Sequence, residues 1–158
     1  MIHPVAKKIL RWYGRHQRDL PWRRTTDPYA IWVSEIMLQQ TQVQTVLPYY
    51  RRFLTRFPTV QSLAATSLDE VLKAWENLGY YARARHLHAA AGQIVKRWQG
   101  LLPSKEEELR LLPGIGAYTA AAIASIAYGI KAPALDGNVR RVLCRLFAVQ
   151  GPLDQSRT

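Results

Sequence analysis

Apolar side chains recur three and four positions apart along most of the chain, which is the spacing of an amphipathic α-helix. The pattern is clearest in three segments, whose apolar positions are Val5, Ile9, Trp12 and Tyr13; Val71, Leu72 and Trp75; and Leu87, Ala91, Ile94, Val95 and Trp98. No stretch alternates apolar and polar residues as a strand does. With the prolines and glycines between the segments, the pattern predicts an all-α protein of about eight to ten helices joined by short loops.

Three helix starts can be read from polar residues. Asp27 precedes Pro28, which combines an N-cap side chain with proline at the first helical position. Ser67 and Ser104 each stand three residues before a glutamate, the spacing of a capping box. We therefore predict helices that begin directly after Asp27, Ser67 and Ser104.

Charge points to a polyanionic partner. The 158 residues include 22 Lys and Arg against 11 Asp and Glu, a formal net charge of +11. Such a surplus attracts polyanions, and phosphate neutralisation supplies most sequence-independent binding to DNA or RNA. An anionic membrane surface is the alternative partner. No apolar run approaches the roughly 18 residues of a membrane-spanning helix, and the N-terminus lacks a signal-peptide core.

The chain has a single cysteine, Cys144. This excludes a disulfide scaffold, and also any four-cysteine metal or iron–sulfur site built from this chain alone. Cys144 lies in an apolar run, where we expect it to fill the core.

A glycine-containing turn is predicted within the run L-L-P-G-I-G-A-Y-T-A, residues 111–120. Two glycines around one aliphatic residue allow the backbone itself to approach a partner closely. The next helix would begin near Gly116 and aim its free N–H groups at an anion such as a DNA phosphate, with Ile115 anchored in the core. A G-x-G alone is typical of ordinary turns, but its flanks and the net charge favour a phosphate-binding hairpin. Its contact residues would be Pro113, Gly114, Ile115, Gly116, Tyr118 and Thr119.

Two carboxylates could form a glycosidic-bond-cleaving pair. Glu35 is the only acid among mostly apolar neighbours on a predicted helix, and Asp136 stands before Gly137 at a predicted helix start. An apolar pocket would raise the pKa of Glu35, as a general acid requires, whereas N–H bonds from a helix start would keep Asp136 ionised. Taken alone, each acid has a simpler interpretation: Glu35 on an exposed helical turn, and Asp136 as an N-cap.

Three motifs together resemble one family. The runs S-E-I-M-L-Q-Q-T-Q-V and L-D-G-N-V-R-R-V-L, with the hairpin between them, are similar to those of the MutY adenine DNA glycosylases of the helix-hairpin-helix superfamily. The resemblance covers about residues 4 to 150. It implies a six-helix barrel domain over residues 21–131, with the helix-hairpin-helix at about 105–128. Residues 1–20 would be an N-terminal helix of a second helical domain that resumes at 132–158.

The resemblance also implies an activity: hydrolysis of the N-glycosidic bond of adenine mispaired with 8-oxoguanine or guanine in double-stranded DNA, a base-excision repair reaction. Carried over by position, Glu35 is the acid that protonates adenine N7. Asp136 is the carboxylate that stabilises or briefly traps the sugar cation, and Asn138 orients the catalytic water or Glu35. Bifunctional relatives, which resemble endonuclease III, carry a lysine where this chain has Tyr118. A tyrosine has no amine for a Schiff base, so we predict base removal without an efficient lyase step.

Further positions match the family's DNA contacts. The extruded adenine would enter a pocket lined by Trp22, Arg23, Leu38 and Tyr118. The residues expected to contact the opposite base or to wedge into the duplex are Gln40, Thr41, Leu78 and Tyr80. Alternatives stay open, because Trp22 could anchor a core turn, and Tyr80 with Tyr81 could be core aromatics. A solvated, DNA-facing basic edge is expected from Arg83, Arg85, His86 and His88, none of them a metal ligand.

The expected assembly is a monomer bound to mismatched DNA, in a bacterial-type, nucleoid-associated and cytoplasmic setting. The family's C-terminal segment carries four cysteines for a [4Fe–4S] cluster, which this chain lacks. We therefore expect a chain truncated before the iron–sulfur segment, with no cofactor held by its own residues. Two alternatives remain: a thymine- or uracil-specific mismatch glycosylase of the same fold, and a truncated DNA-binding core without activity.

Overall fold

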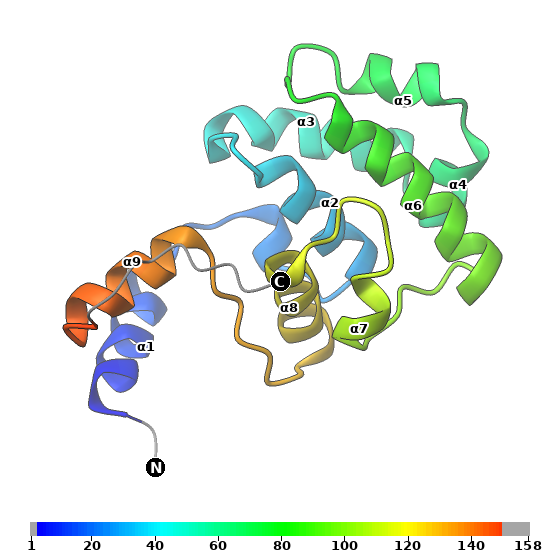
Figure 1. Cartoon of the computed structure of the whole chain (residues 1–158). Helices are drawn as coiled ribbons and strands as arrows, with labels where there is room; N and C mark the ends of the chain where they lie inside the picture. Colours follow the sequence, from blue (N-terminus) through cyan, green and yellow to red (C-terminus); the bar gives the residue numbers. More distant parts are fainter. Residues whose placement is uncertain (1–2, 150–158) are drawn as a thin grey trace.

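A computed structural model of the protein describes residues 3–149. Within that range the backbone forms nine α-helices and one short 3₁₀-helix, with no strand (Figure 1). The predicted all-α class is confirmed. The elements are α1 (Pro4–His16), η1 (Pro21–Arg23), α2 (Pro28–Leu38), α3 (Val43–Arg56), α4 (Val60–Ala65), α5 (Leu68–Ala74), α6 (Ala82–Trp98), α7 (Glu106–Leu109), α8 (Ala117–Tyr128) and α9 (Gly137–Leu146).

Two of the three predicted helix starts are confirmed. The Asp27 carboxylate accepts the backbone N–H of Tyr29 at 3.1 Å at the start of α2. The Ser67 hydroxyl caps α5 by accepting the N–H of Glu70 at 3.3 Å. The capping box at Ser104 is wrong: α7 begins at Glu106 with no side-chain cap. Three successive glutamates occupy its first turn, where the helix dipole stabilises negative charge.

Helix α2 lies at the centre of the protein and packs against α3, α6 and α8. Most of its side chains are buried, which is expected of a helix with neighbours on several sides. Ala120, Ala121 and Ala124 on α8 are 0–2% exposed. Such small side chains let α8 approach α2 closely, and this brings residues of the two helices to the same pocket.

Helices α1 and α9 come from opposite ends of the described chain and lie side by side (Figure 1). The rings of His3 and Phe147 meet edge to face with centroids 5.6 Å apart. Neither helix contains a buried residue. The expectation that Cys144 fills the core is therefore wrong, because its helix packs too sparsely and leaves the thiol partly exposed. No helix in residues 3–149 is long and apolar enough to cross a bilayer.

Candidate active site

A pocket of about 410 Å³ opens beside the middle of α2. It is lined by residues of α1, η1, α2, α3 and α8 and of the loop between α1 and η1. Glu35 and all four residues predicted to line the adenine pocket are among them: Trp22, Arg23, Leu38 and Tyr118. These residues span almost a hundred positions of sequence, so the fold alone brings them together. Which molecule they bind stays a prediction.

Glu35 is largely shielded from solvent on α2. Ile31 and Leu38, one helical turn before and after it, line the same pocket, as residues three and four apart on a helix do. Burial raises the pKa of Glu35, and the Tyr118 hydroxyl facing the carboxylate partly offsets that rise through a hydrogen bond. An exposed helical turn is thus the wrong interpretation of Glu35. The site favours the protonated form, which can donate a proton.

Trp22 serves two purposes. Its ring is 7% exposed and meets Tyr50 edge to face at 5.2 Å, so the core-anchoring interpretation is correct. The same ring also lines the pocket. The neighbouring Arg23 donates to the Arg18 carbonyl oxygen at 3.2 Å and lies over the ring of Tyr13, 5.2 Å from its centroid. Tyr13 and Arg18 thus complete one wall, and sequence reasoning missed both because no local signal links them to Glu35.

Asp136 is the N-cap of α9. One of its carboxylate oxygens accepts the N–H of Val139 at 2.7 Å, and the other accepts the Asn138 side-chain amide at 3.2 Å. The side-chain Oδ1 of Asn138 in turn accepts a hydrogen bond of 2.8 Å from the Arg141 guanidinium. Asn138 therefore orients Asp136 in this structure, whereas orientation of a water or of Glu35 stays a prediction.

Tyr118 links the two carboxylates electrostatically. Burial, followed by the nearby charges of Glu35 and Asp136, raises the pKa of Tyr118 to about 12. Glu35 and Tyr118 line the pocket, whereas Asp136 and Asn138 are not among its lining residues. The neutral phenol donates its hydrogen bond to Glu35.

The predicted hairpin precedes α8. Gly114 has φ +77°, in the left-handed region, and Ile115 is 5% exposed, so the expected anchoring of Ile115 in the core is confirmed. Gly116 is the N-cap of α8 with φ −84°, so only the first glycine needs its conformational freedom. The first turn of α8 presents N–H groups without intrahelical partners, which suits an anion. Thr119 is 4% exposed and accepts a 3.4 Å hydrogen bond from Gln39, so its hydroxyl points to α2.

The residues expected to contact the opposite strand come from two turns. Gln40 is exposed in the turn after α2, and Tyr80 is 60% exposed in the turn before α6. The interpretation of Tyr80 as a core aromatic is therefore wrong. Leu78, by contrast, is 5% exposed and belongs to the hydrophobic core. This burial conflicts with the expected contact of Leu78 with DNA, and a wedge role for Tyr80 stays a prediction.

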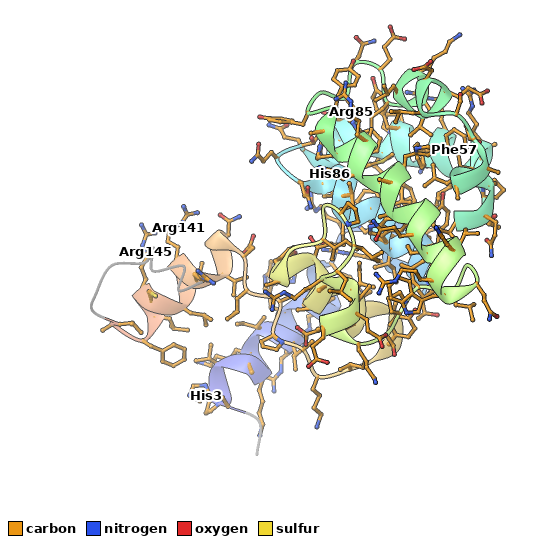
Figure 2. The ribbon with its side chains drawn as sticks, turned by 45° about the vertical axis from the view of Figure 1, so that its right-hand side comes forward. His3, Phe57, Arg85, His86, Arg141 and Arg145 are labelled. Atoms are coloured by element: carbon orange, nitrogen blue, oxygen red, sulfur yellow. The ribbon has the colours of Figure 1, made fainter. Side chains whose placement is uncertain are left out.

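The expected basic edge on α6 is only half right. Arg85 and His86 are exposed on the surface of the helix (Figure 2). Arg83 is 8% exposed, and the ring of His88 is hydrogen-bonded to the Thr66 carbonyl oxygen at 2.8 Å. Arg83 is buried because of helical periodicity: it lies on the inner face of α6 together with Leu87, one turn further on. Counting along α6 would have found this.

Within residues 3–149 no group of three or more His, Cys, Asp or Glu side chains is placed to hold a metal ion. The whole sequence contains one cysteine. A four-cysteine cluster therefore has no ligand set among the residues of this chain.

Residues 33–157 match the profile of the HhH-GPD superfamily of base excision DNA repair proteins. Human adenine DNA glycosylase is 50% identical over 150 residues, which cover 89% of this chain and 28% of that protein. The adenine DNA glycosylase of Mycolicibacterium smegmatis is 46% identical over 154 residues, covering 97% of this chain and 51% of that protein. The chain thus spans about a quarter to a half of the length of these curated relatives.

Two solved structures are similar in fold. A thermostable thymine-DNA glycosylase superposes with a TM-score of 0.83 at 32% identity, over 88% of this chain and 64% of that chain. Endonuclease III in a non-covalent complex with DNA gives a TM-score of 0.79 at 22% identity, over 97% of this chain and 74% of that chain.

Proposed function

Because the chain belongs to the HhH-GPD superfamily of base excision DNA repair proteins, we propose that it carries the catalytic centre of a DNA glycosylase that removes adenine from mispairs. The observation that carries the proposal is Glu35, a carboxyl with a pKa raised by burial, in a pocket with Trp22 and Leu38. Identities of 46–50% to adenine DNA glycosylases over most of the chain support adenine as the base.

The proposed reaction starts with adenine turned out of the duplex into the pocket. Trp22 and Leu38 offer flat and aliphatic surfaces for the purine, and Arg23 offers hydrogen-bond donors. Glu35 transfers its proton to adenine N7 while the bond between N9 and the sugar C1′ breaks, so the bonding electron pair leaves with a neutral base. Asp136 stabilises the positive charge that remains on the sugar. A water molecule adds to C1′ and loses its proton to a carboxylate, which leaves adenine and an abasic site.

Binding of the rest of the duplex is assigned to the surfaces around the pocket. The first turn of α8 would hold a phosphate, supported by its unpartnered N–H groups and by the net charge of +11. Gln40 and Tyr80 would fill the gap left by adenine and contact 8-oxoguanine or guanine on the opposite strand. We propose a monomer on mismatched DNA. Without an amine at position 118, strand cleavage by a lyase step would be inefficient.

The deciding experiment compares two duplexes under single-turnover conditions, one with adenine opposite 8-oxoguanine and one with thymine opposite guanine. The first should release its base, and Glu35→Gln should slow that release by about 10²–10⁴-fold. Faster release from the second duplex would favour a thymine-specific enzyme, a candidate that the similarity to thymine-DNA glycosylase supports. Binding of both duplexes with no release from either would identify a DNA-binding core that needs further protein for catalysis.

A further inference from the structure

Arg83 is a buried cation with an unusual set of partners. Its guanidinium donates to the carbonyl oxygens of Ile36, Met37 and Gln39 at 3.0, 2.8 and 2.5 Å. No carboxylate within residues 3–149 forms an ion pair with it. Burying a charge is costly unless hydrogen bonds compensate. These carbonyls belong to the last turn of α2 and the residue after it, where the helix dipole places negative charge, so the end of α2 compensates a cation from α6.

The same guanidinium reaches a second segment of the chain. Its other terminal nitrogen donates to the Thr41 hydroxyl and to the Gly79 carbonyl oxygen, both at 3.1 Å. Arg83 also lies over the ring of Tyr80, 5.3 Å from the centroid. One side chain thus joins the turn after α2 to the turn before α6. A planar fork with donors in several directions can do this, whereas a lysine ammonium is a single point.

Both turns contain backbone that needs support. Gln40 has φ 57° and Tyr80 has φ 50°. Left-handed backbone at a residue with a side chain is strained, and it persists where surrounding contacts hold it. Each of these residues lies next to a group that bonds to Arg83. They are also the two exposed residues that the proposed function assigns to the gap in the duplex, and they line one small pocket together with Arg83.

We infer that Arg83 is a positioning residue that holds Gln40 and Tyr80 as one rigid unit for contact with the opened duplex. This rests on the proposed function, which assigns the opposite-strand contact to these two residues. Arg83 touches no reacting atom in this role. It acts through the two turns, so it should control how well the protein distinguishes a mispair from paired DNA, and not how tightly it binds DNA in general.

The test measures affinity by fluorescence anisotropy for a duplex with adenine opposite 8-oxoguanine and for the same duplex fully paired. Arg83→Lys keeps a positive charge at the end of α2 but cannot donate hydrogen bonds to both turns. Arg83→Met removes the charge and the hydrogen bonds. Arg97→Met, at an exposed arginine near the other end of the same helix, is the matched control. We expect Arg83→Lys to lower the ratio of the two affinities about tenfold while binding to the paired duplex stays within about twofold.

Coupling to Tyr80 separates positioning from general stabilisation. If Arg83 acts through the turns, Arg83→Lys should lower the affinity ratio less in a Tyr80→Ala protein than in the wild type, so that the two losses do not add fully. An unchanged ratio in Arg83→Lys, or losses that add fully in the double variant, would overturn the inference, as would a wild-type chain without preference for the mispair. Absence of adenine release with the preference intact would count against the proposed function alone, because the readout is binding.

Discussion

The hydroxyl of Tyr118, on the first turn of α8, faces the carboxylate of Glu35 in the middle of α2. This contact opposes the effect of burial on the pKa of Glu35. The acid therefore experiences two influences of opposite sign, of which burial is the larger. The pKa of Glu35 therefore depends on the distance between α2 and α8. That distance is short because Ala120, Ala121 and Ala124 of α8 are small.

Removing the Tyr118 hydroxyl should shift the pH dependence of base release. Because that hydroxyl lowers the pKa of Glu35, Tyr118→Phe should raise the pKa further and keep the acid protonated to higher pH. The rate should fall as pH rises through the pKa of Glu35 in both proteins, with the falling limb of the variant displaced to higher pH. Single-turnover rates across a pH series would measure this. A limb displaced to lower pH would contradict the arrangement.

Glu35→Gln should separate activity from stability. Loss of a general acid typically costs about 10²–10⁴-fold in rate. The raised pKa of Glu35 means that the folded state favours the protonated form, so this contribution to stability is present at low pH and is lost as pH rises through the folded-state pKa. A neutral glutamine removes that loss, so the variant should be more stable than wild type at neutral pH. Thermal melts at several pH values would show whether the variant is more stable than wild type at neutral pH and not at low pH. Glu107→Gln, at an exposed glutamate, is the control.

The two glycines of the hairpin should respond differently to substitution. A Cβ on Gly114 would lie 2.8 Å from the His86 Cβ, and its φ of +77° disfavours any side chain. Gly114→Ala should therefore cost at least about 1–3 kcal/mol of stability. His86→Ala should not relieve it, because alanine retains the clashing carbon.

Gly116, by contrast, has open space where a Cβ would lie. Gly116→Leu should leave the melting temperature almost unchanged and weaken binding to all duplexes alike, because it covers the N–H groups of α8. Titrations with paired and mispaired duplexes would show this. A change in mispair preference with undiminished general affinity would mean that the hairpin does not hold a phosphate.

Leu78 and Tyr80 provide a matched pair for the wedge. Leu78→Ala should destabilise the fold by about 2–5 kcal/mol, since the side chain is 5% exposed in the core. Tyr80→Ala removes a ring that is 60% exposed, so it should leave stability nearly intact and reduce the preference for mispaired DNA. Denaturant unfolding and duplex titrations of both variants would test the assignment. A stable Leu78→Ala protein with lost preference would restore Leu78 as a wedge.

Local signals predicted what local interactions decide. Asp27 and Asp136 were identifiable as N-caps because a capping side chain bonds to N–H groups two or three residues away. The apolar neighbours of Glu35 were compatible with burial, but an exposed helical turn stayed open until the fold showed the pocket. Arg83 was misassigned because an arginine among basic residues is typical of a surface, and its five acceptors come from segments up to 47 residues away. Tyr13 and Arg18 line the pocket because of the way α1 and the loop after it lie against α2. No sequence motif predicts this packing.

Asp136 has an observed structural task and a proposed catalytic one, which substitution can separate. Its carboxylate caps α9 through the N–H of Val139, and its charge is proposed to stabilise the sugar cation. Asparagine is as good an N-cap as aspartate, so Asp136→Asn should retain the stability of the wild type and lose base release. Asp136→Ala should lose both, at a cost of about 1 kcal/mol for the missing cap. Thermal melts and single-turnover assays on the same preparations would compare them. Equal activity in the asparagine variant and the wild type would show that the negative charge is not needed, and would leave Asp136 with its structural task alone.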